Sequence, residues 1–122
     1  MITPWGNADQ TRNIGEGIVS VSTPSHGGYY VPARLYNRMP AELRSNKYGG
    51  GTWFEEDCEW ALVALAFPRL FEPRQIQAAI STINVESAPD ACYHAAWTWL
   101  QNSPEGIALR AGQIPYRNRA SA

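Results

Sequence analysis

The chain has 122 residues, of which 44% are apolar and 17% charged, and this is the size and composition of one globular domain. Ten Lys and Arg residues against eleven Asp and Glu residues give a formal net charge of −1. A general nucleic-acid binder would be basic and a DNA mimic strongly acidic, so direct binding of nucleic acid is not expected. Five Trp and six Tyr residues are many for this length, and both types favour cores and protein interfaces.

The N-terminal stretch "MITPWGNADQ" lacks the basic and apolar segments of a signal peptide, and no apolar run has the length of a membrane-spanning helix. We therefore expect a cytoplasmic protein with no membrane partner. The two cysteines, Cys58 and Cys92, lie in apolar stretches that favour helices. Reduced, buried thiols are expected for both, and a single disulfide is the alternative.

The first third of the chain favours β structure. Residues 17–23, "GIVSVST", alternate between two faces and are rich in β-branched side chains, which predicts the best strand of the chain. The polar stretch 8–14 precedes it, and Asn13–Gly17 has the residues of a hairpin loop. "YYV" at Tyr29–Val31 predicts a third short strand. Together these stretches predict a three-stranded antiparallel meander.

The middle of the chain changes its periodicity. Pro32 suits the first turn of a short helix over "PARLYNRM", and Pro40 opens another turn. Three consecutive glycines, Gly49–Gly51, mark a break. This break is either a mobile loop or a place where backbone segments pass closely.

The second half favours helices. The strongest is predicted to begin near Phe54 or Glu55 and to end before Pro68, with Cys58 on its core-facing stripe beside Leu62 and Leu65. Residues 73–83 form the next, with Ile76, Ala79, Ile80 and Ile83 at helical spacing. The third starts near Pro89 and places Cys92, Ala96, Trp99 and Leu100 on one stripe.

A short fourth helix has the clearest boundaries: Ser103 as the N-cap, Pro104 at the first helical position and Gly112 beyond the end. The tail from about residue 113 is expected to be loose. Strands followed by helices predict an α+β fold, in which a small N-terminal antiparallel sheet of about three strands packs against three to four C-terminal helices. We expect a single domain over residues 1–122.

An acidic cluster, Glu55, Glu56, Asp57 and Glu59, falls at the predicted start of the strongest helix. Acids in a first helical turn are stabilised by the helix dipole, by about 0.3–1 kcal/mol each. Alternatively, the cluster binds a cationic partner or a metal, or forms a catalytic dyad. A metal site is less favoured, because no loop rich in oxygen ligands accompanies the cluster. We expect no metal and no cofactor, because no phosphate loop, dinucleotide fingerprint or zinc motif is present.

His26 and Cys58 are the candidate base and nucleophile of a catalytic pair, with Glu55 or Glu56 as a further carboxylate. The position of Cys58 on an apolar stripe favours a structural thiol instead. His94, set among Ala, Tyr and Trp, is expected on a helix surface or satisfied in the core.

A basic run interleaved with tyrosines follows the predicted sheet, and Tyr with Arg is the composition expected of a protein-binding hot spot. A solvated face with salt bridges to the acidic cluster is the alternative. The residues expected to contact a partner are Tyr29, Tyr30, Arg34, Tyr36, Arg38, Arg44, Lys47, Tyr48, Glu55, Glu56 and Glu59.

Two longer stretches, "GIVSVSTPSHGGYYV" and "WFEEDCEWALVALAFPRLF", carry a resemblance to known sequences. They resemble a family of uncharacterised domains carried by proteobacterial plasmids, integrative elements and phages, whose pattern includes "STPSHGG" and "EEDC-x-WA". The matching positions run from Trp5 and Gly6 to Phe71. The resemblance implies a bacterial host and a mobile-element context, and it implies no particular reaction.

On these grounds we expect a small accessory protein of a phage or mobile element that binds and inhibits a host defence protein or ribonucleoprotein, as anti-CRISPR and anti-restriction proteins do. It is expected to act without catalysis. A small hydrolase-like enzyme using His26, Cys58 and Glu55 is one alternative, and a structural or regulatory interaction domain is another. If the His26 turn and the acidic cluster are both functional, they should lie in contact in the fold.

Overall fold

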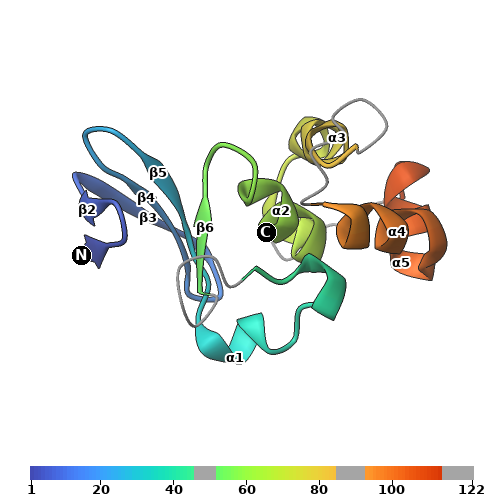
Figure 1. Cartoon of the computed structure of the whole chain (residues 1–122), viewed down its shortest axis with the longest axis horizontal. Coiled ribbons are helices and arrows are strands. Elements are labelled where there is room, and N and C mark those ends of the chain that lie inside the picture. The colour runs from blue at the N-terminus through green and yellow to red at the C-terminus, as the bar shows by residue number, and fades with distance from the viewer. Residues whose placement is uncertain (46–51, 85–92, 114–122) are drawn as a thin grey trace, which may run out of the picture. The chain divides into compact units, whose positions relative to one another are not determined.

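The structure is a computed structural model that describes residues 1–45, 52–84 and 93–113. The chain divides into two compact units, Met1–Trp60 and Ala61–Ala122, called here the N-terminal and C-terminal units. The N-terminal unit contains the sheets and the C-terminal unit contains helices (Figure 1). The predicted α+β class is therefore confirmed.

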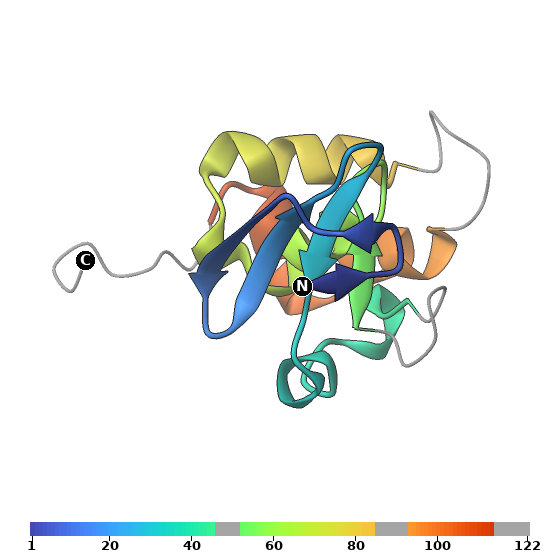
Figure 2. The same cartoon turned by 90° about the vertical axis from the view of Figure 1, so that its left-hand side faces the viewer.

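The main sheet of the N-terminal unit is antiparallel throughout, in the order β3-β4-β5-β6, and a separate two-stranded hairpin, β1-β2, precedes it. Figure 2 shows this hairpin lying over one face of the four-stranded sheet. The predicted meander is confirmed in β3, β4 and β5, but the prediction of about three strands was too low. The strands are β1 Ile2–Thr3, β2 Gly6–Asn7, β3 Gln10–Gly15, β4 Ile18–Ser22, β5 Gly27–Tyr30 and β6 Trp53–Glu55.

The turn between β3 and β4 is tighter than predicted. β3 continues to Gly15, so only Glu16 and Gly17 lie between the strands, both at positive φ, of 55° and 91°. Positive φ at both central residues matches the right-handed twist of a two-residue hairpin. The Asn13 Oδ1 atom accepts a hydrogen bond of 2.8 Å from the Gly15 N–H and holds the approach to this turn.

Strand β6 corrects the largest error of the sequence-based prediction. The helix was predicted to begin near Phe54 or Glu55, but residues 53–55 pair with β5 in the register Tyr30↔Trp53 and Gly28↔Glu55. Phe54 is fully buried between the part-exposed Trp53 and Glu55, which is the period of two of a strand. Trp and Phe favour strands, and pairing with β5 outweighs the helical pattern of the following residues. The helix α2 starts only at Trp60, so the acidic cluster does not occupy its first turn.

Between β5 and β6 the chain forms two short helical turns, as predicted: α1, Ala33–Tyr36, with Pro32 as its N-cap, and η1, Ala41–Leu43, after Pro40. The glycine break at residues 49–51 lies outside the described residues. The buried apolar side chains of this unit come from strands and turns alike: Ile18, Val21, Val31, Leu35, Met39, Leu43 and Phe54.

The C-terminal unit begins with the apolar part of α2, whose residues 61–65 are all buried. In α3 a capping box joins Glu72 and Gln75, and Ile76, Ala79 and the C-cap Ile83 are buried as predicted. Ile80 is only partly buried. The helical elements associated with this unit are α2 Trp60–Ala66, η2 Pro68–Leu70, α3 Pro73–Thr82, α4 His94–Asn102 and α5 Pro104–Arg110.

Helices α4 and α5 form a close pair. Ser103 caps α5 by accepting a 2.9 Å hydrogen bond from the Gly106 N–H, and Gly112 follows the helix at φ +79°, both as predicted. A Cβ atom on Gly106 would lie 2.5 Å from the Leu100 Cα, so glycine permits this approach. The predicted stripe of α4 is confirmed at Ala96, Trp99 and Leu100, and the predicted start at Pro89–Cys92 lies outside the described residues.

Candidate functional site

The segment before β5 is a closed turn built around the Thr23 side chain. The Thr23 hydroxyl donates to the His26 carbonyl oxygen at 2.8 Å and accepts from the His26 N–H at 3.0 Å. The Thr23 N–H adds a third hydrogen bond to the same carbonyl at 2.7 Å. Thr23 is buried, whereas Pro24, Ser25 and His26 are exposed. The turn is therefore held by the Thr23 side chain and backbone, and it leaves His26 exposed to solvent.

The two glycines after His26 are required by close packing. The Gly27 carbonyl accepts a 3.0 Å hydrogen bond from the Glu56 N–H, and a Cβ on Gly27 would lie 2.8 Å from the Glu56 Oε2 atom. A Cβ on Gly28 would clash with the Phe54 carbonyl oxygen and lie 2.5 Å from the Trp5 Cη2 atom. The "HGG" and "EED" stretches are thus in contact at Gly27 and Glu56.

Three aromatic rings gather on one face of the sheet. Trp5 lies against Gly28, and its ring meets Trp53 edge to face, with the centroids 5.8 Å apart and the planes at 86°. Trp53 also contacts its cross-strand partner Tyr30, at a centroid distance of 5.1 Å. All three side chains are partly exposed. We call Trp5, Tyr30 and Trp53 the aromatic face.

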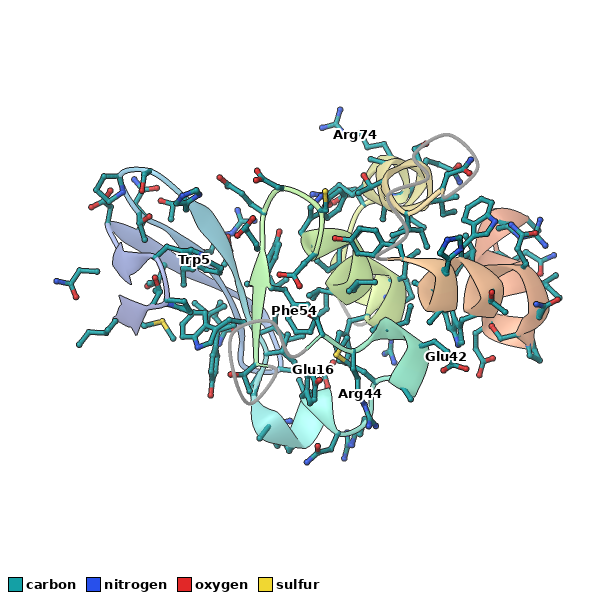
Figure 3. All side chains as sticks on the ribbon, viewed as in Figure 1. Trp5, Glu16, Glu42, Arg44, Phe54 and Arg74 are labelled. Atoms are coloured by element: carbon teal, nitrogen blue, oxygen red, sulfur yellow. The ribbon has the colours of Figure 1, made fainter. Side chains whose placement is uncertain are left out.

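The opposite side of the same sheet is more closely packed. Tyr29 pairs with the buried Phe54, whose ring is 6.1 Å from that of Tyr36. Figure 3 shows Trp5 and Phe54 on opposite sides of the sheet. Burial raises the pKa of the Tyr29 phenol, and the nearby Arg12 guanidinium partly offsets this by lowering it. Tyr29 pairs with Phe54 and Tyr30 with Trp53, so the two tyrosines face opposite sides of the sheet, as their strand positions predict.

The residues of the acidic cluster differ in burial: Glu59 is buried, whereas Glu56 and Asp57 are exposed. Glu59 is only 8% exposed, and its carboxylate accepts hydrogen bonds from the Ser45 hydroxyl and, at 3.2 Å, from the Glu55 N–H. Glu59 therefore joins the segment before residue 46 to the turn after β6. Glu56, Asp57 and Cys58 are exposed in that turn. No group of three or more His, Cys, Asp or Glu side chains in the described ranges could hold a metal ion.

The expectation of a buried Cys58 was wrong. Because the helix begins at Trp60, Cys58 lies in the turn before it and is a free, exposed thiol. Its predicted stripe with Leu62 and Leu65 does not form. Cys92 lies outside the described residues.

Two of the predicted contact arginines hold backbone carbonyls of their own unit. Arg34 donates to the Glu16 carbonyl at 2.7 Å, across to the β3–β4 turn. Arg44 donates to the carbonyls of Met39 and Asn37 and stacks over the Tyr36 ring at 5.7 Å. Figure 3 shows Arg44 and Glu16 on their separate segments. These contacts give both arginines an architectural role.

The other members of that set are placed differently. Tyr36 donates from its hydroxyl to the Ser45 carbonyl at 3.0 Å, and Arg38 is exposed. Lys47 and Tyr48 lie outside the described residues. His94, at the first position of α4, is exposed, which is one of its two expected positions.

The sequence-based list of contact residues missed Trp5 and Trp53. Trp53 and Phe54 are residue types that favour strands, and this weak signal could have placed Trp53 on a sheet. Trp5 has no comparable local signal, since its position depends on the space left by Gly28 in a distant strand. No helix in the described part of the chain is both long and apolar enough to cross a membrane.

Comparison with known proteins gives a family and no relative of known activity. No curated protein matches the chain, and no solved structure matches it. The model of a family described as a domain of unknown function, DUF7007, matches residues 1–114. The chain therefore belongs to the DUF7007 family.

Proposed function

We propose that this chain is a non-enzymatic binding protein that uses the aromatic face to contact and inhibit a host defence protein or ribonucleoprotein, as anti-CRISPR and anti-restriction proteins do. The observation that supports this proposal is the grouping of three partly exposed rings, Trp5, Tyr30 and Trp53, on one sheet face. Trp and Tyr are the residues most enriched among the hot spots of protein interfaces.

The rigidity of the aromatic face favours binding. Trp5 is held between Gly28 and Trp53, and Trp53 and Tyr30 are fixed in neighbouring strands. Side chains that are already ordered lose little conformational entropy when a partner binds, so more of the contact energy appears as affinity. The β1–β2 hairpin that carries Trp5 also exposes Met1 and Ile2, at 52% and 80%, which adds apolar surface.

The choice of target rests on the resemblance to domains of plasmids, integrative elements and phages. Small proteins of such elements commonly act against host defence by binding, and this chain carries no recognisable catalytic or cofactor motif. A bacterial nuclease, or the complex that guides it, is therefore the proposed partner. Membership of the DUF7007 family assigns no reaction that competes with this proposal.

A second candidate function is a small hydrolase-like enzyme. The exposure of Cys58 removes the main argument against a nucleophilic role, and the Glu56 carboxylate lies beside Gly27, the residue after His26. This candidate requires a thiolate at neutral pH and hence unusually fast alkylation. Alkylation of Cys58 at the rate of a free peptide thiol would exclude it.

The proposal is tested by comparing two tagged proteins in lysate of the bacterial host: the natural chain and the double variant Tyr30→Ser, Trp53→Ser. A partner captured by the first and lost with the second is identified by mass spectrometry and purified. We expect the natural chain to inhibit the nuclease activity of this partner, and Cys58→Ser to inhibit equally. Equal capture by both proteins, or capture without inhibition, would contradict the proposal.

A further inference from the structure

Strand β3 is the longest described strand, and it lies at an edge of its sheet. It has six residues, against three in β6 at the other edge, and among the described strands it pairs only with β4. An edge strand exposes a row of backbone N–H and C=O groups, and natural edges are commonly protected by short length, by charged residues or Pro, or by a bulge. The β3 sequence "QTRNIG" contains no Lys or Pro, and Arg12 is its only charged residue. Its irregularity lies between Asn13 and Gly15, so Gln10–Asn13 keeps a regular register.

An open groove of about 620 Å³ runs beside this edge. Gln10 pairs with Ser22, and Arg12 with Ser20, so these four side chains share one face of the sheet. It is the face opposite the aromatic face, because Ser20 pairs onward with Tyr29 and not with Tyr30. The groove is lined by Asp9, Gln10, Thr11, Arg12, Ser20 and Ser22.

The residues that line the groove are all polar or charged, with one cation, Arg12, and one anion, Asp9. Arg12 is exposed, and its charge acts on the Tyr29 phenol two strands away, so the guanidinium lies on the groove side of the sheet. Pockets for small molecules enclose most of their ligand and are largely apolar. An open, polar groove along a sheet edge fits an extended chain better than it fits a small molecule.

We propose that β3 is a docking edge for an extended peptide segment of another protein, which adds a strand beside β3 and places a carboxylate on Arg12. This surface is separate from the aromatic face, so the proposal does not depend on a binding role for the aromatic face.

The physics of strand addition explains both affinity and selectivity here. Backbone hydrogen bonds to β3 supply affinity for any extended peptide, and alternate side chains of the peptide reach the groove. An Arg–carboxylate pair is charge-assisted and can be bidentate, so one acidic residue at that position gives selectivity. Asp9 lines the same groove and would repel a further acid, so a single acid in a polar segment fits better than an acidic tract.

The test is an NMR titration of the full chain with short acetylated peptides of alternating Thr and Val that carry Glu, Gln or Lys at the centre. We expect the amide shifts to concentrate in Gln10–Gly15, and the Glu peptide to bind about tenfold more tightly than the Lys peptide. Arg12→Glu should reverse this preference and Arg12→Gln should abolish it. Arg74→Glu, at an exposed arginine of α3, is the matched control and should leave the preference unchanged (Figure 3).

Three results would overturn the proposal. The first is a titration in which the β3 amides do not move. The second is equal affinity for the Glu and Lys peptides, or an Arg12→Glu variant that keeps the original preference. The third is a set of β3 shifts that depends on protein concentration without peptide, because the edge would then pair with a second copy of the chain.

Discussion

The backbone N–H of Glu56 donates a 3.0 Å hydrogen bond to the carbonyl oxygen of Gly27. This bond extends the β5–β6 pairing by one step beyond Gly28↔Glu55, and it joins two stretches that are far apart in sequence. The close approach of the two strands explains the glycine pair, because Gly27 leaves room for the Glu56 side chain and Gly28 for Trp5. Both stretches therefore have a structural role, and the aromatic face depends on it.

Replacing Gly28 by Ala should destabilise the fold severely. The added Cβ would clash with the Phe54 carbonyl oxygen, which is backbone and cannot rotate away, and would press on the Trp5 ring. We expect a loss of about 3 kcal/mol or more of unfolding free energy in urea denaturation. Gly112→Ala is the control: its Cβ would meet no atom within 4 Å, and only its positive φ carries a cost, of about 1 kcal/mol. Equal losses in the two variants would show that Gly28 is not closely packed.

Replacing Glu59 by Ala should also be costly. The substitution removes the buried carboxylate that accepts part-buried hydrogen bonds from the Ser45 hydroxyl and the Glu55 N–H. We expect a loss of about 1–3 kcal/mol of unfolding free energy, and a smaller loss for Glu59→Gln, which keeps one carbonyl acceptor. Chemical denaturation followed by circular dichroism measures both. An Ala variant as stable as the natural chain would mean that Glu59 is not a structural link.

Cys58 should react with a thiol reagent in the native protein. Because its side chain is exposed and free, we expect alkylation under native conditions, mapped to this residue by peptide mass spectrometry. Cys58→Ser should change the unfolding free energy by no more than about 0.5 kcal/mol, as is usual for an exposed position. If Cys58 reacts only after denaturation, its thiol is buried in the native protein, as the sequence predicted.

Tyr29 should ionise at a higher pH than a free tyrosine. Burial raises its pKa above the usual value of about 10, and Arg12 limits the rise. The stability that Tyr29 contributes is therefore fully present below about pH 10, and it is lost as the pH rises through the raised pKa of the folded state. Ultraviolet titration against Tyr29→Phe isolates this group. Arg12→Gln should raise the pKa of Tyr29 further, and a fall would contradict the assigned cause.

The sequence predicted correctly those elements whose limits are set by neighbouring residues. The alternation in residues 18–22 and the Ser103, Pro104 and Gly112 boundaries of α5 were predicted correctly, since caps and alternation act within a few residues. Strand β6 was missed because its state depends on pairing with β5, which residues 53–55 do not encode alone. The two-residue strands of the β1–β2 hairpin are too short for a periodic signal.

The candidate site was predictable only in part. Contact between the His26 turn and the acidic stretch was expected only on the condition that both motifs are functional, and the structure shows it at Gly27 and Glu56. The predicted helix began before Cys58, whereas α2 begins at Trp60. The prediction therefore placed Cys58 in the core, although it lies exposed in a turn. Trp5 reaches the aromatic face because Gly28, in a distant strand, leaves it space, and single-sequence patterns do not report such long-range packing.

The binding affinity of Trp53→Ala for the captured partner tests the central claim most directly. Isothermal titration calorimetry compares it with Trp97→Ala, which removes a partly exposed tryptophan from α4 in the other unit. We expect Trp53→Ala to weaken binding by about 30-fold or more, the effect of a hot-spot residue of about 2 kcal/mol, and Trp97→Ala to bind as the natural chain does. Tyr30→Ala should repeat the loss if Trp53→Ala proves unstable. Unchanged affinity in a folded Trp53→Ala or Tyr30→Ala variant would contradict a binding role for the aromatic face.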